Sequence, residues 1–325
     1  MNKFKSFDFL VSVAKNYYFD SLSQSEIAKK YNISRPTVAN ILKECKEKGI
    51  VELRINDTSP FSSPMSVKLK NLYGLENVCI IPAETDYSMT LNKTCFQAAN
   101  FFSSLLRDGI RVGISWGTAL YHMVRQLPHL PVSNSEVVQL MGGLGASALF
   151  YDGFELSRII SEKMDCPFYP FLAPLLVNSE ELKEELLNEP GILGTYEKTK
   201  NLDIALVGLS SDKPEDSALV RAGFLSLNEA QKIFEDGSCG HLCGYHYDAH
   251  GRFMDIVINR RVVGISPEHL LRIKRRIGIA CGEQKAKAIR AAIKGKLITD
   301  LFTDEITALK ILKQDEQIQN TMSTS

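Results

Sequence analysis

The chain has 325 residues, enough for two or three domains and for at least one full hydrophobic core. Hydrophobic residues make up 44% and charged residues 23%, as in ordinary soluble globular proteins. No apolar run approaches the roughly 18 residues of a membrane span, and the first ten residues do not form a secretory signal. Seven scattered cysteines are more typical of a reducing cytosol than of a disulfide framework. We therefore expect a cytoplasmic protein without membrane contact.

The formal net charge is zero, but the two ends of the chain differ. Residues 1–54 hold ten Lys/Arg and six Asp/Glu, a net charge of +4. The remainder holds 28 and 32 of these residues, a net charge of −4. A basic N-terminal segment on an acidic body is a weak indication that this end binds nucleic acid.

Three helices are predicted in the first fifty residues. The segment Phe7–Tyr18 repeats apolar residues at helical spacing. Ser23 precedes a second, short helix, and Ser34 caps a third helix with Pro36 in its first turn. Residues 50–55 are predicted to form a strand.

The second and third helices meet the requirements of a helix-turn-helix. Ala28 is the small residue where the helices pack closely, and Ile33 is the apolar residue of the turn. The outer face of the third helix then carries side chains that suit DNA bases and phosphates: Ser34, Arg35, Thr37, Asn40 and Lys43. A module used only for packing or dimerisation is the alternative, but the basic outer face favours DNA binding. We expect residues 1–56 to be the DNA-binding domain.

Residues 57–64 are rich in serine and proline and predict a linker. Beyond them, apolar strands alternate with amphipathic helices. Strands are expected at 78–82, 111–115, 137–141, 204–209, 256–258, 262–265, 277–280 and 301–302. Helices are expected at 90–106, 118–124, 154–163, 285–293 and 304–312. This alternation predicts an α/β domain over residues 65–314, with a mostly parallel sheet covered on both faces. Residues 315–325 are expected to be a disordered tail.

A candidate anion site follows the strand at 111–115. Gly117 allows the backbone to approach a ligand closely. The N–H groups of Gly117, Thr118 and Ala119 open the next helix, and the helix dipole favours an anion there. The hydroxyl groups of Ser115 and Thr118 add donors. The pattern predicts a phosphate site at the carboxyl end of a strand, where ligands bind in open α/β sheets.

A single glycine turn is more often a plain strand-to-helix connection. Two further glycine turns in equivalent positions, Gly142-Gly143 and Gly282, favour a binding site. Lys285, just inside the helix after Gly282, is expected to be the charge partner of the phosphate. Trp116 either covers the ligand or packs in the core.

Eight short motifs occur in a characteristic order along the chain. They are Gln24-Ser-Glu-Ile-Ala, Ile33-Ser-Arg-Pro-Thr-Val, Val112-Gly-Ile-Ser-Trp-Gly-Thr, Val137-Val-Gln-Leu-Met-Gly-Gly, Phe171-Leu-Ala-Pro-Leu, Asp203-Ile-Ala-Leu-Val-Gly-Leu, Gly282-Glu-Gln-Lys and Thr303-Asp-Glu-Ile-Thr-Ala. From about residue 15 to residue 312 the chain resembles the SorC family of sugar-responsive regulators. The resemblance implies an effector domain related to sugar-phosphate isomerases, a homo-oligomer, usually a tetramer, and an operator affinity that changes when a phosphorylated sugar binds. It does not distinguish a repressor from an activator. Paired DNA-binding domains imply a two-fold operator.

Three positions depart from the family pattern. Met141 stands where one member of the family has a lysine that forms an imine with its sugar, so we expect noncovalent binding. His241 stands where the family often has an aspartate that holds sugar hydroxyls, and it is expected to contact the effector with fewer acceptor atoms. Cys281 replaces one of two paired glycines.

A metal site is an alternative use of one segment. Cys239, His241, Cys243 and His246 are zinc-type ligands, and the first three would share one face of a strand. The spacing has no second pair of ligands elsewhere, which favours packing and effector contact. We expect neither a metal nor another cofactor.

Two other functions are weighed against a regulator. The first is an enzyme, a sugar-phosphate isomerase or deaminase with an attached DNA-binding domain. Isomerisation needs a carboxylate base near the substrate carbon, but Asp152, Glu155 and Glu283 form no recognisable acid–base pair. We therefore expect no catalysis. The second is a DNA-binding scaffold without a small ligand, which the glycine turns beside hydroxyl and ammonium groups disfavour.

Overall fold

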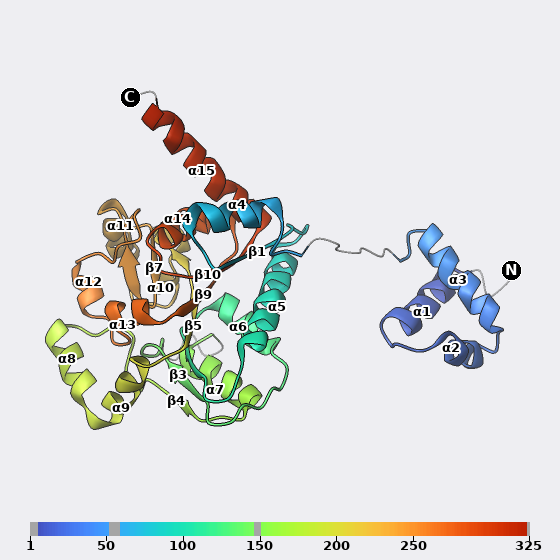
Figure 1. Ribbon diagram of the computed structural model, residues 1–325, viewed down its shortest axis with the longest axis horizontal. Helices are drawn as coiled ribbons and strands as arrows, with labels where there is room; N and C mark the ends of the chain where they lie inside the picture. The colour runs from blue at the N-terminus through green and yellow to red at the C-terminus, as the bar shows by residue number, and fades with distance from the viewer. Residues whose placement is uncertain (1–5, 52–58, 146–150, 324–325) are drawn as a thin grey trace. The chain divides into compact units, whose positions relative to one another are not determined.

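The computed structural model describes residues 6–51, 59–145 and 151–323. The chain forms two compact units, residues 1–58 and 59–325, and each is described by itself (Figure 1). The first unit contains α1 (Phe7–Tyr18), α2 (Gln24–Tyr31) and α3 (Arg35–Glu47). These are the three helices that the sequence predicts.

Local sequence determines where α2 and α3 begin. The Ser23 hydroxyl accepts the Glu26 N–H at 3.3 Å, and the Glu26 carboxylate accepts the Ser23 N–H at 2.8 Å, which completes a capping box. Ser34 caps α3 by accepting the Thr37 N–H at 3.2 Å. Asn32 in the turn has a φ of 52°, a left-handed conformation that asparagine tolerates. The two helices are therefore joined by a short and well-defined turn.

The three helices share a small apolar core. Ala28 lies buried in α2, and Val38 and Ile41 lie buried in α3. This is the packing that the predicted helix-turn-helix requires. Ile50 and Val51 are in a bend, not in a strand, and the rest of the strand expected over 50–55 lies outside the described residues.

A seven-stranded sheet forms the centre of the second unit. Its order is β1-β10-β9-β5-β2-β3-β4, and every neighbouring pair is parallel. The strands are β1 (Asn77–Ile81), β2 (Arg111–Ile114), β3 (Glu136–Gln139), β4 (Phe168–Tyr169), β5 (Ile204–Gly208), β9 (Arg275–Ile279) and β10 (Asp300–Asp304). The predicted α/β class with a mostly parallel sheet is confirmed.

The strands are buried on both faces because successive side chains point to opposite sides. In β1, Val78 and Ile80 pack into one apolar cluster, and Cys79 and Ile81 pack into another. Helices α5 (Tyr87–Leu105), α6 (Thr118–Arg125) and α7 (Gly153–Met164) cover one face. Helices α4 (Pro64–Tyr73), α14 (Ala286–Lys294) and α15 (Glu305–Ser323) cover the other. The connections add α8 (Glu180–Asn188), α9 (Pro190–Thr199), α10 (Ala218–Arg221), α11 (Leu227–Glu235), α12 (Val257–Arg260) and α13 (Pro267–Arg272).

A second, antiparallel sheet lies next to α14. It consists of β6 (Ser210–Ser211), β7 (Gly240–Leu242) and β8 (Tyr245–Tyr247). The close approach of β7 to α14 requires Gly240, because a Cβ there would lie 2.6 Å from the Ala288 Cβ. The sequence analysis did not predict this sheet.

Two expected strands are absent from the described structure. Residues 256–258 were expected to be a strand, but Val257–Arg260 is the short helix α12. A run of three apolar residues fits either element, so its periodicity does not decide. Residues 262–265 form isolated bridges, Val262 with Leu176 and Gly264 with Met141, instead of a strand.

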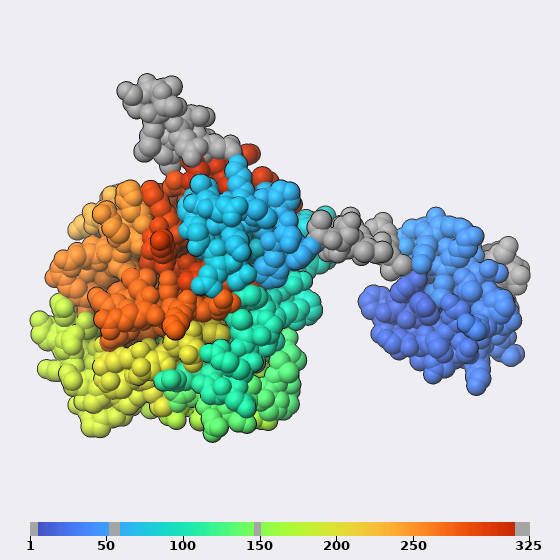
Figure 2. Space-filling view, viewed as in Figure 1, coloured from blue at the N-terminus to red at the C-terminus, as the bar shows by residue number. Residues whose placement is uncertain are grey.

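The two ends of the second unit pack together. Segments α4 and α15, far apart in sequence, lie side by side (Figures 1 and 2). The Asp315 carboxylate accepts the Tyr73 hydroxyl at 2.5 Å and the Arg290 Nε–H at 2.6 Å. Helix α15 extends through Ser323, where a disordered tail was expected from residue 315. Pro64, which the sequence analysis placed in the linker, begins α4.

Candidate functional site

A cavity of about 150 Å³ lies at the carboxyl ends of β2, β5 and β9. It is bounded by the residues that follow these strands, by α10 and by the small sheet. Six of the eight residues predicted from the sequence line it: Ser115, Gly117, Thr118, Ala119, His241 and Lys285. Parallel strands of an open α/β sheet place their following turns together in this way.

The N-terminus of α6 opens onto this cavity. Gly117 is its N-cap residue, with a φ of 132° that favours glycine and without a capping side chain. The backbone N–H groups of Thr118 and Ala119 have no hydrogen-bond partner among the described residues. The Gly117 N–H, which was expected to face the anion, instead donates to the Tyr151 carbonyl at 3.1 Å. Two free donors and the helix dipole therefore remain for an anion.

Lys285 lies beside this helix terminus at the end of a short 3-10 helix, Glu283–Lys285. Its ammonium group makes no ion pair with any residue that the structure describes, and burial lowers its pKa. Arg221 of α10 is a second cation in the cavity wall. The described lining contains no aspartate or glutamate. The cavity is therefore suited to an anion.

Gly142 and Gly143 do not line the cavity, contrary to expectation. Their N–H groups donate to the Val263 carbonyl at 2.9 Å and to the Ala173 carbonyl at 2.8 Å. A Cβ on Gly142 would lie 2.4 Å from the Pro174 carbonyl oxygen. Gly142 therefore allows two loops to pack closely, whereas a Cβ on Gly143 would make only an ordinary contact with Asp152.

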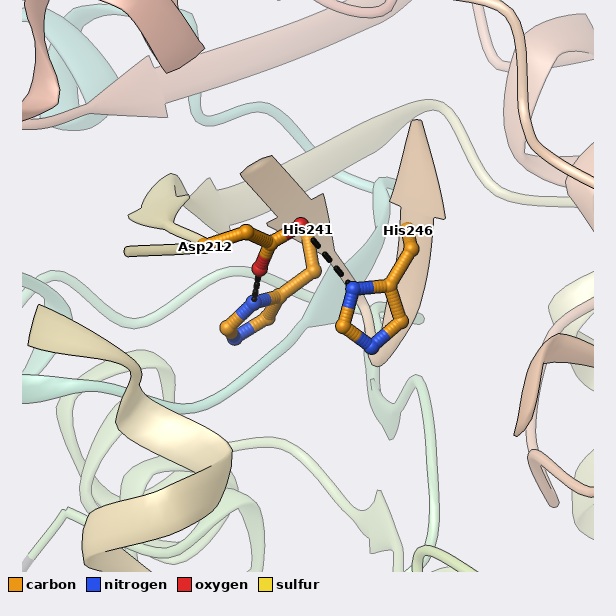
Figure 3. Close-up of side chains that lie close together, drawn as sticks. All are labelled: Asp212, His241 and His246. Carbon is orange, nitrogen blue, oxygen red and sulfur yellow. Dashed lines mark hydrogen bonds and ion pairs between the residues drawn. The ribbon is translucent and has the colours of Figure 1, made fainter. Parts of the chain in front are cut away.

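His241 belongs to a buried polar cluster centred on Asp212 (Figure 3). The Nδ1 atom of His241 lies 2.7 Å from Oδ1 of Asp212, and the Nδ1 atom of His246 lies 2.9 Å from Oδ2. The Ser238 hydroxyl also donates to this carboxylate. Burial alone would raise the pKa of Asp212, but the imidazoles hold it well below its usual range. The indole of Trp116 stacks on His241 with ring centroids 6.4 Å apart.

The sequence analysis missed Asp212 and Ser238. Asp212 follows β6, a strand of two residues, and lies 29 positions before His241 in the chain. The one available signal was a polar triplet directly after the strand at 204–209. Met141, by contrast, is buried in the core and does not line the cavity.

The cysteines do not complete the zinc site that was weighed from the sequence. Among the described residues, the one group close enough to share a metal ion is Asp212, His241 and His246. Cys243 lines the cavity, and Cys239 is buried against the small sheet. All seven cysteines lie in described segments and are free thiols.

The outer face of α3 in the first unit has free polar side chains. Arg35, Asn40 and Lys43 are exposed. Arg35 and Asn40 make no side-chain hydrogen bond or ion pair within the described structure, and Lys43 makes one exposed pair with Glu47 at 3.7 Å. Ser34 and Thr37 hydrogen bond to each other at 2.7 Å. The structure thus presents three polar side chains for a partner, beside a helix N-terminus.

Comparison with known proteins matches both units. A winged helix-turn-helix DNA-binding family matches residues 20–52, and the Sugar-bind family, a sugar-binding domain, matches residues 60–313. The structure of the full-length sorbitol operon regulator SorC from Klebsiella pneumoniae superimposes with a TM-score of 0.77 at 25% identity, covering 95% of this chain and 99% of that one. The chain belongs to the SorC family. It is a DNA-binding transcription regulator with a sugar-binding domain.

Curated relatives match this chain over nearly its whole length. The deoxyribonucleoside regulator of Bacillus subtilis (strain 168) is 29% identical over 299 residues, which cover 92% of this chain and 95% of the relative. The transcriptional regulator LsrR of Escherichia coli O139:H28 is 30% identical over 305 residues, which cover 93% of each chain. Both names describe regulators. Among the described residues, no helix combines the length and the hydrophobicity that a bilayer crossing needs.

Proposed function

We propose that this SorC-family regulator changes its operator affinity when a small phosphorylated sugar binds noncovalently in the cavity at the carboxyl ends of β2, β5 and β9. One observation carries the proposal. The uncapped N-terminus of α6 and the unpaired ammonium of Lys285 face the same cavity, whose described lining has no acidic residue.

A phosphate group would supply the partner that the N-terminus of α6 and the ammonium group of Lys285 lack. A phosphate oxygen can accept the free N–H groups of Thr118 and Ala119, and the hydroxyl groups of Ser115 and Thr118 are within the same wall. A dianion also restores a charge partner to Lys285, which burial otherwise penalises. Arg221, an exposed residue that also lines the cavity, supplies a second cation.

Other residues of the cavity wall suit a sugar. Trp116 offers an apolar ring face, and His241 offers a nitrogen atom. Met141 lies outside the cavity and has no amine, so binding needs no imine at that position. The sugar is therefore held by hydrogen bonds and packing.

The DNA side of the proposal rests on α3. Arg35 and Asn40 read bases in the major groove, and Ser34, Thr37 and Lys43 contact the DNA backbone. The regulator acts as a cytoplasmic homo-oligomer, a tetramer by family resemblance, on a two-fold operator. Effector binding shifts an existing equilibrium between DNA-competent and incompetent states.

Catalysis gains no support from the cavity. Asp152 accepts the Leu144 and Phe154 N–H groups at 2.6 and 2.8 Å, so its carboxylate is a helix cap. Glu155 and Glu283 form ion pairs outside the cavity lining. An isomerase would need one of these carboxylates beside its substrate.

Isothermal titration calorimetry of the full chain tests the ligand class. Phosphorylated aldoses, ketoses and polyols are titrated in parallel with the same compounds without phosphate. The variant Lys285→Met is compared with a matched control, Lys287→Met, which changes an exposed lysine two residues away. We expect one phosphorylated compound to bind, its parent to bind at least about a hundred-fold more weakly, and Lys285→Met alone to remove the difference. Borohydride reduction should leave the protein mass unchanged. Equal binding of a sugar and its phosphate, or a trapped imine, would contradict the proposal.

A further inference from the structure

The carboxylate of Asp212 is almost completely enclosed and is shared by two imidazoles. Asp212, His241 and His246 are each 3% exposed or less. Each imidazole turns its Nδ1 atom toward a different carboxylate oxygen, and each Nε2 atom lies on the far side of its ring (Figure 3). The Ser238 hydroxyl is the third group on this carboxylate. The cluster therefore has one acceptor group and three donors.

This arrangement determines which nitrogen of each ring carries the proton. The pKa of Asp212 is held well below its usual range, so its carboxylate is ionised at neutral pH and can only accept hydrogen bonds. Each Nδ1 atom must then donate. Burial lowers the pKa of His241, which keeps its ring neutral. A neutral ring that carries its proton on Nδ1 has a lone pair on Nε2.

Within the described structure, no donor reaches the lone pair on Nε2 of His241. Its Nε2 atom is buried and has no hydrogen-bond partner among the described residues, and the ring lines the cavity. The stacked indole of Trp116 limits the movement of the ring. A buried acceptor without a donor is costly, and a ligand that supplies the donor removes this cost. The Nε2 atom of His246 is also unpartnered, but that ring does not line the cavity.

We propose that Asp212 is a positioning residue that fixes His241 as a hydrogen-bond acceptor, so that the cavity selects effectors with a hydroxyl group facing Nε2 and rejects a carboxylate there. The inference rests on the proposed function, because it names the chemistry of the effector's nonphosphorylated end. A sugar or polyol hydroxyl can donate to Nε2. A carboxylate can only accept, and it would meet a lone pair in a site that excludes water.

The tautomer can be measured without any effector. In protein labelled with [15N]histidine, two-bond 1H–15N correlation spectra show which ring nitrogen carries the proton. The chain has six histidines, and the signals of His241 are assigned by their loss in His241→Gln. We expect His241 to be protonated on Nδ1 alone at neutral pH. Protonation on Nε2 would overturn the proposal, whatever the effector is.

The selection is tested with two matched pairs of compounds. Glycerol 3-phosphate and 3-phosphoglycerate, and sorbitol 6-phosphate and 6-phosphogluconate, differ within each pair by a terminal hydroxyl against a carboxylate. Calorimetry on the full chain should show that the alcohol of at least one pair binds about ten-fold or more tightly than the acid. Asp212→Asn should lose most of this preference and keep its affinity for inorganic phosphate. Equal or tighter binding of the acids by the parent would overturn the selection.

His246→Phe is the matched control for a general loss of structure. It removes one hydrogen bond from the same carboxylate and leaves the bond between Asp212 and His241 in place. We expect this variant to keep both the His241 tautomer and the preference for the alcohol. If His246→Phe and Asp212→Asn lose the preference equally, the effect is structural and the positioning role is refuted.

Two further outcomes are distinguishable. If none of the four compounds and no inorganic phosphate binds, the proposed function fails, and the selection fails with it.

A metal ion is the other possible occupant, because Asp212, His241 and His246 lie close enough to share one. The distances of 2.7 and 2.9 Å between Nδ1 and the carboxylate oxygens are those of hydrogen bonds. Zinc content is measured by inductively coupled plasma mass spectrometry. One equivalent of tightly bound zinc that is lost in His246→Phe would show that the cluster binds a metal ion and would overturn the proposal.

Discussion

Two single residues in the cavity wall, Lys285 and His241, have polar groups that lack a partner in the absence of a ligand. Lys285 is half-buried and its ammonium group has no described ion-pair partner, and His241 has a buried Nε2 atom without a described hydrogen-bond partner. Neither feature stabilises the free protein. Their presence in one cavity is consistent with a ligand that carries a phosphate and a hydroxyl group.

Replacement of Lys285 should therefore separate binding from stability. Because burial lowers the pKa of Lys285, folding disfavours its charged form, and Lys285→Met removes that cost. We expect the free energy of unfolding of the ligand-free protein to stay within about 1 kcal/mol of the parent or to rise. Urea denaturation followed by tryptophan fluorescence measures it. A loss of several kcal/mol would show that Lys285 is a structural residue.

The histidine in the cavity wall should make stability depend on pH. Burial lowers the pKa of His241 below that of an unfolded histidine, even though Asp212 raises it. The unfolded chain then binds a proton more readily, so stability is lost as pH falls through about 6.5. Asp212, whose pKa is depressed, keeps its contribution until pH falls below its usual value near 3.8. Burial lowers the pKa values of His122 and His269 as well, so they add to the same slope.

The melting temperature should fall between about pH 7.5 and pH 5.5, and His241→Gln should make this dependence shallower. The exposed residue His250 provides the control, because His250→Gln should leave the slope unchanged. Differential scanning calorimetry at matched ionic strength measures both variants. An identical slope in the parent and in His241→Gln would refute the assignment of a buried neutral ring.

At the scale of elements, the sequence predicts those helices and strands that carry a local signal, such as a capping residue, an apolar stripe or an apolar run. The helices of the first unit have caps and apolar stripes, and the long strands are apolar runs followed by glycine turns, so both were predicted. Strands β6, β7 and β8 have two or three residues each, too few for periodicity to reveal. The small sheet brings Asp212 and His246 close to His241. Because this sheet was not predicted, the sequence could not show that Asp212 and His246 lie at the site. Gly142 and Gly143 were expected in the cavity wall but do not line it, and Gly142 shows that a glycine after a strand can also serve close packing.

Helix α3 should separate base recognition from phosphate contact. Asn40→Ala removes an exposed side chain that can read adenine, and we expect it to weaken specific binding by about 1–3 kcal/mol while nonspecific binding persists. Lys43→Ala should weaken both specific and nonspecific DNA binding. It should also reduce the slope of log Kd against the logarithm of the salt concentration by about one unit. Anisotropy titrations at several salt concentrations measure both effects. A uniform loss for Asn40→Ala on all sequences would contradict its assignment to base contact.

At the scale of the whole molecule, the two units perform different tasks and must be coupled. The first unit has the helix α3 that we propose to contact DNA, and the second has the cavity that we propose to bind an anion. Coupling requires that the effector bind one state of the regulator more tightly than another. A change of operator affinity by 5- to 150-fold corresponds to about 1–3 kcal/mol of coupling free energy, and the effector's affinity must change with DNA by the same factor.

The most direct measurement is fluorescence anisotropy of the full chain on DNA from upstream of its own transcription unit, at fixed salt, with and without a panel of sugar phosphates. Salt must be fixed because phosphate contacts make DNA affinity strongly dependent on ionic strength. The account predicts specific binding to a two-fold sequence, changed by one phosphorylated sugar and not by its unphosphorylated parent, and no such response in Lys285→Met. Sequence-independent binding that no sugar phosphate changes would contradict it.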